Sequence, residues 1–387
     1  MSRKQLFILA LLVLIIGGAG IAMFQRDTES WKGPDERLGQ RVLPNLQVSD
    51  ITQIHIKHKK DELNLTNESD TWVIKERGGF PADPALISEL TFKAREWKIV
   101  QSEPIGEAQH PRMEVAAPDA TEGASTLLEF RGKDGKALAS LFLGKKKLGK
   151  PPLQVKGFDK GQPEGRYLLV SSDPKTLLLV QDPMNNVEPK PEKWIAKDFV
   201  KVDRIKKLVV DTPGTTISYQ LSREQEAGDW ALGQLRPGEK TDPSAAVSAT
   251  NAFYSLAFTD VATDVKPEQL GRATTITADT FDGWHYVMRV APKPNDDANV
   301  LFTVAVTGEA KQTARVPVKD EKPEEKEKRD KEHEEKFKRL QAQLAREKTL
   351  DKWVFVVDKK LLAPVLRERV RFIEQPEKPE KAVRKAG

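Results

Sequence analysis

Apolar and polar residues alternate in several short stretches of this chain, and such alternation is typical of strands with one buried face. The first group covers residues 51–74, where three stretches separated by polar turns predict an antiparallel meander. A helix is expected next, because Asp83 suits an N-cap and Pro84 suits the first helical position. Apolar residues then recur at helical spacing as far as Ala94.

The segments after this helix again have the character of strands. Residues 97–100 are predicted to be extended, and residues 126–130 and 137–143 flank a Lys-Asp-Gly-Lys turn that indicates a hairpin. Residues 166–170 predict one more strand, and the run 174–180 is predicted to form a short helix.

The order of these elements recurs in the second half of the chain. The apolar residues at positions 51, 54 and 56 recur 154 positions later, and a Trp-led strand recurs 158 positions later. The Asp-Pro helix start returns as Asp242-Pro243, and a second Asp-Gly hairpin turn is found at Asp282-Gly283. We match residues 353–357 with 167–170, and residues 359–365 with the short helix predicted for the first half.

The sequence therefore predicts an α+β protein with two repeated units, each an antiparallel sheet covered by a main helix. We expect the first unit at 45–199 and the second at 200–374, with a charged helical insertion at about 318–350. Acidic and basic residues balance within this insertion, and Glu and Lys four apart support a solvated helix. The Pro-, Glu- and Lys-rich tail at 375–387 is expected to be disordered.

The later half of the charged insertion carries an apolar stripe made of Phe337, Leu340 and Leu344. Their spacing places the three side chains on one face of a helix, so the stripe predicts a docking face. Two occupants remain open at this point, the protein's own body and a partner helix. Three residues are too few to indicate a coiled coil.

An uncharged apolar run of 19 residues occupies positions 6–24. As a helix it would span ~28 Å, close to the ~30 Å of a bilayer core. Arg3 and Lys4 precede it, and the positive-inside rule then places the amino terminus in the cytoplasm. We predict one transmembrane anchor and an extracytoplasmic body.

The domain plan at this end is a cytoplasmic tip with the anchor at 1–26 and a juxtamembrane linker at 27–44. Cleavage of the anchor as a signal peptide remains an alternative, because Gly20 and Ala22 are small residues of the kind found before a cleavage site.

Composition narrows the function classes. The 387 residues include no cysteine, which excludes disulfides, thiolate nucleophiles and Cys-ligated metal centres. A body of this size without disulfides suggests a bacterial envelope, with the anchor in the inner (cytoplasmic) membrane and the body in the periplasm. The 63 basic and 58 acidic residues form no basic block with interleaved aromatics, so no nucleic-acid binding is expected.

Motifs for catalysis or cofactor binding are absent from the sequence. None of the five histidines belongs to an H-E-x-x-H motif, and no G-x-S-x-G nucleophile elbow occurs. Ser172 and Lys175 fit S-x-x-K, but a helix start at Asp173-Pro174 explains them better. We therefore predict no catalytic residue, no cofactor and no metal ligand.

A run of lysines is the one candidate for charge-based binding. It comprises Lys145, Lys146, Lys147 and Lys150, with glycines interspersed, but it lacks the order of a phosphate-binding loop. One interpretation is a basic hairpin tip, and the other is a contact site for anionic wall polymer or phospholipid headgroups.

Several of these features together resemble the bacterial domain-of-unknown-function family DUF4340. They are the short anchor, a meander ending in Trp-x-Ile, a Phe-Pro-Ala-Asp helix start, an Arg-Tyr-Leu-Leu-Val strand and the second copy. The resemblance lies in residues 70–90, 165–182 and their counterparts, and would extend over about 45–372. It implies a single-anchor envelope protein, often encoded beside membrane subunits of gliding-motility-type ABC transporters, and no established catalytic residues. The charged insertion departs from the family pattern.

We therefore expect a non-enzymatic, single-pass membrane protein with an extracytoplasmic body. Its expected role is that of an accessory or scaffold subunit of an ABC-type transport or envelope system, with transporter membrane subunits as partners. The alternative is a module that binds cell-wall polymer or polysaccharide through the lysine run. A third hypothesis is a hydrolase that uses a pair of carboxylates, which one sequence does not reveal.

Overall fold

The computed structural model describes residues 37–149, 161–215, 217–310 and 322–374. The chain divides into two compact units, which are described one at a time. Unit 1 comprises Met1–Asp70 and Pro84–Lys190, and unit 2 comprises Thr71–Asp83 and Pro191–Gly387.

Some of the predicted segments lie outside the described residues. They are the anchor at 6–24, most of the linker at 27–44, Lys150 and the tail at 375–387. In the part of the chain that the structure describes, no helix is both long enough and apolar enough to cross a membrane.

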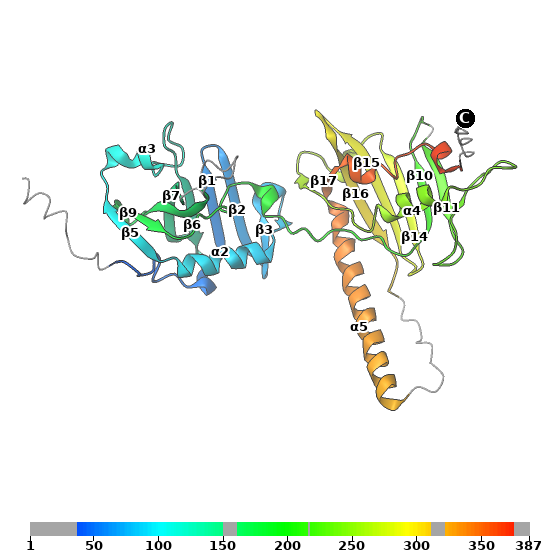
Figure 1. Cartoon of the computed structure of the whole chain (residues 1–387), viewed down its shortest axis with the longest axis horizontal. Helices are drawn as coiled ribbons and strands as arrows, with labels where there is room; N and C mark the ends of the chain where they lie inside the picture. The colour runs from blue at the N-terminus through cyan, green and yellow to red at the C-terminus, as the bar shows by residue number, and fades with distance from the viewer. Residues whose placement is uncertain (1–36, 150–160, 216, 311–321, 375–387) are drawn as a thin grey trace, which may run out of the picture. The chain divides into compact units, whose positions relative to one another are not determined.

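The protein is a mixed α and β structure with two antiparallel sheets and few helices (Figure 1). The first sheet, within the described residues, has the strand order β4-β3-β2-β1-β6-β7-β8-β9-β5. Its strands are β1 (Gln53–His58), β2 (Asp61–Glu68), β3 (Thr71–Ile74), β4 (Phe80–Pro81), β5 (Ile99–Pro104), β6 (Thr126–Arg131), β7 (Ala137–Leu148), β8 (Pro163–Val170) and β9 (Asp173–Val180). The helices and 3-10 turns of this half are η1 (Val48–Asp50), η2 (Lys75–Arg77), α2 (Pro84–Glu96), η3 (Glu107–Gln109) and α3 (His110–Met113).

The predicted meander, the helix after Asp83 and the Asp-Gly hairpin are confirmed. The apolar residues of β1 and β2 alternate, since Ile54 and Ile56 are opposite Leu65 and Leu63 and all four have almost no exposed surface. They form one side of the core. Helix α2 runs along the sheet (Figure 1) and buries Ile87, Leu90 and Ala94.

The helix predicted at 174–180 is wrong, because these residues form strand β9. Leu177 to Val180 are all buried, so the run lacks the alternation that marks a half-exposed strand. Strand β9 pairs with β8 on one side and with β5 on the other. Asp173 and Pro174 therefore begin a strand after the β8–β9 turn, and Ser172 lies in that turn rather than before a helix.

The second sheet, again within the described residues, has the order β12-β11-β10-β14-β15-β16-β17-β13. Its strands are β10 (Ile205–Asp211), β11 (Ser218–Ser222), β12 (Ala231–Leu232), β13 (Asp260–Ala262), β14 (Thr274–Thr280), β15 (His285–Lys293), β16 (Asp296–Thr307) and β17 (Val354–Asp358). The accompanying helices and turns are η4 (Pro191–Lys193), α4 (Pro243–Asn251), η5 (Pro267–Gln269), α5 (Pro323–Lys348), η6 (Thr349–Lys352), α6 (Lys359–Leu362) and η7 (Arg369–Phe372).

The two sheets share one strand order once β4 is set aside. Strand β17 then occupies the place of β9, and β16 the place of β8. Our match of residues 353–357 with 167–170 was therefore one strand off. Helix α6 follows β17, while the short helix that we matched to it does not exist in the first half.

Each half of the chain also contains a small, separate apolar cluster. In the first half Ile105, Val115, Leu169 and Leu177 pack together after strand β5. In the second half the cluster consists of Leu270, Ala273, Ala291, Leu301, Val354 and Val356, after strand β13. A 3-10 turn follows each edge strand, and in each a glutamine accepts from a backbone N–H three residues earlier, at 3.4 Å for Gln109 and 2.9 Å for Gln269.

Several aromatic rings of unit 2 contact one another. Phe80 of β4 contacts the rings of Phe258, Trp353 and Phe355 in edge-to-face geometry, with centroids 5.1–6.0 Å apart. Helix α4 begins as predicted, because the Asp242 carboxylate accepts from two backbone N–H groups of its first turn at 2.9 and 3.0 Å.

Candidate functional site

The charged insertion forms helix α5 (Pro323–Lys348), and its C-terminal half is fixed to unit 2. Leu344 is buried, and Glu347 is only 1% exposed. Tyr286 of β15 donates its hydroxyl hydrogen to Glu347 Oε2 at 2.8 Å, and the Lys201 backbone N–H donates to Oε1 at 3.2 Å. Gln343, one turn earlier, donates to the same Oε1 at 2.9 Å. A buried carboxyl group with several donors thus locks the helix to the sheet.

The donor in the contact between Tyr286 and Glu347 is well defined. Burial raises the pKa of Tyr286, and the adjacent Glu347 raises that pKa further. The phenol therefore stays protonated at physiological pH, and its O–H group donates the hydrogen bond to the carboxyl group of Glu347. An ion pair at the end of α5 adds to this contact, since Arg346 Nη1 lies 3.6 Å from Asp198 Oδ1.

The apolar stripe predicted from the sequence lies on the side of α5 that faces its own unit. Phe337 and Leu340 line a cavity of about 300 Å³ between the helix and the β14–β15 turn. The other lining residues are Arg204, Phe281, Asp282, Gly283, Trp284, Ala310, His333 and Lys336. Of the two occupants left open by the sequence, the protein's own unit thus covers Leu344, and a partner contact at Phe337 and Leu340 stays a prediction.

The N-terminal half of α5 has no buried face. Residues 322–332 are exposed throughout, and Figure 1 shows the helix extending away from β16 and β17. Ion pairs one turn apart support it, with nitrogen–oxygen distances of 2.7 Å for Glu327–Lys331 and for Glu334–Lys338. Each such pair contributes only about 0.2–0.5 kcal/mol, so the helix depends on its docked half for position. The result is a charged arm with a fixed base.

The candidate lysines lie on strand β7. Lys145, Lys146 and Lys147 are exposed, and Lys146 donates to Asn185 Oδ1 at 2.7 Å. Lys146 is the register partner of Arg166 on β8, whose buried guanidinium donates to the Gly144 carbonyl at 3.0 Å. Burial lowers the pKa of Arg166. Lys145, Lys146 and Lys147 therefore lie on a strand end, with Glu114 and Glu188 close enough to act on Arg166, and binding of an anionic polymer there stays a prediction.

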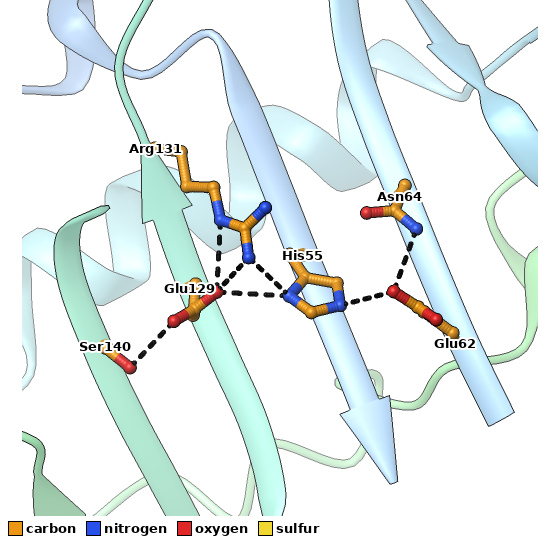
Figure 2. A network of polar contacts seen from close by, with 6 residues as sticks. All are labelled: His55, Glu62, Asn64, Glu129, Arg131 and Ser140. Atoms are coloured by element: carbon orange, nitrogen blue, oxygen red, sulfur yellow. Dashed lines mark hydrogen bonds and ion pairs between the residues drawn. The ribbon is translucent and has the colours of Figure 1, made fainter. Parts of the chain in front are cut away.

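A polar network that the sequence did not indicate crosses strands β1, β2, β6 and β7 in unit 1 (Figure 2). His55 is at its centre and is 8% exposed. Its Nε2 lies 2.9 Å from Glu62 Oε1, and its Nδ1 lies 3.1 Å from Glu129 Oε2. Arg131 donates to Glu129, and Ser140 donates to the other oxygen of Glu129 at 3.2 Å.

Both carboxylates of this network titrate below their ordinary range. For Glu62 a hydrogen bond from Asn64 lowers the pKa, burial opposes it, and His55 adds to the lowering. For Glu129 burial raises the pKa, but hydrogen bonds from Arg131 and His55 outweigh it and the net shift is downward. A hydrolytic general acid needs a raised pKa, whereas the pKa of each carboxylate is shifted in the opposite direction. We regard the network as structural.

Metal binding finds no support in the geometry. Within the described ranges no group of three or more His, Asp or Glu side chains could hold a metal ion.

Sequence reasoning missed the residue that anchors α5. Glu347 follows Leu344 by three positions, so it continues the spacing of the stripe formed by Phe337, Leu340 and Leu344. The sequence signal for a buried Glu347 was its position in line with the apolar stripe. No comparable signal in the sequence indicated Tyr286 as its partner.

The comparisons with known proteins add a family to this geometry. A family model, the domain of unknown function DUF4340, matches residues 72–273, just over half of the chain. The match starts in β3 and ends immediately before β14, and is thus shorter than the span we expected. The search of curated proteins found no match, and neither did the search of solved structures. The chain belongs to the DUF4340 family of domains of unknown function.

Proposed function

We propose that this protein is a non-enzymatic, membrane-anchored adaptor of the bacterial cell envelope whose body presents α5 to a membrane-protein partner. The observation that carries the proposal is the division of α5 into a docked half and an exposed half. Glu347 and Leu344 hold the base of the helix in unit 2, while residues 322–332 extend into solvent. A rigid arm held at one end is suited to contact another protein at a defined position.

The composition of the arm indicates the chemistry of its partner. A helix without an apolar face offers no hydrophobic groove or seam, so its contacts would be ion pairs and hydrogen bonds. Alternating charges of both signs favour a partner with a complementary charge pattern, which affects specificity and association rate more than affinity. The proposed partners are the membrane subunits of an ABC-type transporter.

Other parts of the proposal rest on the sequence. The apolar run at 6–24 supports a single inner-membrane anchor with a periplasmic body. The shared strand order of the two sheets supports an origin by duplication, with one longer helix for each sheet.

The test is affinity purification of the tagged full-length chain from detergent-solubilised membranes. The informative variant combines Lys326→Glu and Arg329→Glu, which lie one turn apart on the exposed half of α5. Acidic residues near a helix N-terminus are compatible with the helix dipole, so α5 is expected to stay folded. The matched control combines Lys133→Glu and Lys136→Glu in the exposed β6–β7 turn.

We expect a transporter membrane subunit to co-purify with the wild type and with the control, and to be lost with the α5 variant. Recovery of the chain alone from wild-type membranes would contradict the adaptor role. Retention of the transporter subunit by the α5 variant would show that the arm is not the contact.

The second candidate is binding of anionic wall polymer. It is favoured by the exposed positions of Lys145 and Lys147 on β7. A pull-down on isolated cell wall at low and high salt distinguishes it, because contacts between exposed charges weaken as salt screens them. Wall binding that disappears at high salt and in a Lys145→Glu, Lys147→Glu variant would support this candidate.

A further inference from the structure

Three large apolar side chains are exposed where the described chain enters unit 1. Leu38, Phe92 and Val100 are 45%, 59% and 46% exposed. They are three of the five large apolar residues that are exposed among the described residues of this unit. Single exposed apolar residues are common, but their gathering at one place is not.

Leu38 and Val100 share one groove, and Phe92 is exposed on the adjoining helix α2; we name these three residues the α2–β5 patch. Leu38 and Val100 line one shallow groove with Lys93 and Glu96 of α2. Phe92 precedes Lys93 and lies one helical turn before Glu96, on the same face of the helix. The first described residues, dark blue in Figure 1, run beside β5 and the end of α2.

The floor of the groove is fixed by hydrogen bonds. Trp97 lies beneath it with only 5% of its surface exposed, and its indole N–H donates to Asp182 Oδ2 at 3.0 Å. The backbone N–H of Gly39 donates to the Ile99 carbonyl at 2.8 Å, and that of Val42 to the Trp97 carbonyl at 2.8 Å. The apolar side chains are thus held outward by a hydrogen-bonded frame.

The register of the sheet relates this patch to the lysines of β7. Ile99 pairs with Val180, Val180 pairs with Arg166, and Arg166 pairs with Lys146. These four residues form one row across strands β5, β9, β8 and β7. The row spans three strand spacings, or about 14 Å. The exposed Lys145 and Lys147 and the α2–β5 patch therefore lie at the same end of the sheet.

We infer that this end of unit 1 lies against the surface of the lipid bilayer. Apolar side chains that reach the boundary of headgroups and acyl chains, with lysines nearby for anionic phosphates, are the pattern of an interfacial membrane contact. Wall polymer would use the lysines but would leave the apolar patch exposed to water. The lipid surface accounts for both features.

The chain itself keeps this surface near the membrane, and here the inference rests on the proposed anchor at 6–24. Twelve residues separate the end of the apolar run from Arg37, directly before Leu38. Fully extended they span at most about 43 Å, so the patch stays within reach of the bilayer. A tether of this length gives a high effective concentration, and a weak contact then suffices.

The test uses the absence of cysteine from the chain, which allows labelling at one chosen position. The full-length protein is reconstituted into vesicles containing phosphatidylglycerol and a lipid-borne quencher, with a fluorophore at Val100→Cys or at Phe92→Cys. The matched control is Leu138→Cys, since Leu138 has the same 46% exposure as Val100. Leu138 lies eight residues from Lys146 on β7, about 26 Å towards the opposite end of the sheet.

We expect quenching to be several-fold stronger at positions 92 and 100 than at position 138. Lys145→Glu together with Lys147→Glu should reduce the quenching at position 100, and so should replacement of phosphatidylglycerol by phosphatidylcholine. Equal quenching at positions 100 and 138 in protein that floats with the vesicles would overturn the inference and leave the anchor intact. If the chain does not float with the vesicles, the proposed anchor fails as well, so the two failures are distinguishable.

Discussion

Removal of the Glu347 carboxyl group should release α5 from unit 2. Its two oxygens accept from the Tyr286 hydroxyl, the Lys201 backbone N–H and the Gln343 amide. In a Glu347→Ala variant the Tyr286 hydroxyl and the Lys201 backbone N–H lose their acceptor. Tyr286 has no exposed surface, so its hydroxyl has no direct access to water. Gln343 is less affected, because its amide also donates to the Lys201 carbonyl at 3.2 Å.

The size of the effect follows from these donors. A buried donor left without a partner costs about 1–3 kcal/mol, so two of them predict a loss of about 2–6 kcal/mol. Part of this loss will be recovered if water enters the space, which favours the lower half of the range. Glu347→Gln should cost less, because its amide oxygen can still accept from Tyr286.

Hydrogen exchange measured by mass spectrometry on the full-length protein in detergent reports on this contact directly. Peptides covering residues 338–348 should exchange faster in Glu347→Ala than in the wild type. The ratio of the two exchange rates should correspond to the lost free energy, and complete release of the helix would remove the protection altogether. The matched control is Glu335→Ala, which removes only an exposed ion pair with Arg339 at 3.4 Å and should change stability by less than about 1 kcal/mol. Unchanged protection of the helix in Glu347→Ala would refute the view that this carboxyl group locks α5 in place.

Three further predictions concern the fold. Asp242→Ala should destabilise α4 by about 1 kcal/mol, seen as a lower urea midpoint for unit 2, and an unchanged midpoint would argue against the cap. Phe80→Ala should cost about 3–5 kcal/mol and speed hydrogen exchange around Trp353, because it removes a ring at the centre of the aromatic cluster. Because the folded-state pKa values of Glu62 and Glu129 are lowered, their contribution is present at neutral pH and is lost as pH falls below about 4. Urea midpoints of unit 1 between pH 3 and 7, compared with Glu129→Gln, check this, and parallel curves would contradict it.

The sequence predicted the strands in which one face is buried and the other is wet. In β6 the residues alternate between buried and half-buried from Thr126 to Arg131, and β14 shows the same period. The helix starts at Pro84 and Pro243 were equally predictable. In each Asp-Pro pair the aspartate suits the N-cap and the proline suits the first helical position. Local chemistry was enough for these elements.

The strands that were missed or misread are covered on both faces. Strand β9 carries four consecutive buried residues, Leu177 to Val180, and β16 carries five, Val300 to Val304, of which Thr303 is the one polar residue. A continuous apolar run has no period, so it does not distinguish a strand from a buried helix. The residues that cover the second face are distant in the sequence. Ile105 and Val115, for example, pack with Leu177. Such pairings cannot be read from a short window.

The same distinction explains the outcome for α5. The spacing of its apolar residues predicted a helix with one docking face. It did not show whether that face packs on its own sheet or on another protein. Arg346 and Glu347 settle the choice for the base of the helix, since both contact the segment Phe199–Lys201 of the same chain. Because the apolar residues are used at the base, the exposed half has only charge to offer. A partner of this arm must therefore be sought among charged surfaces, and its binding should weaken as ionic strength rises.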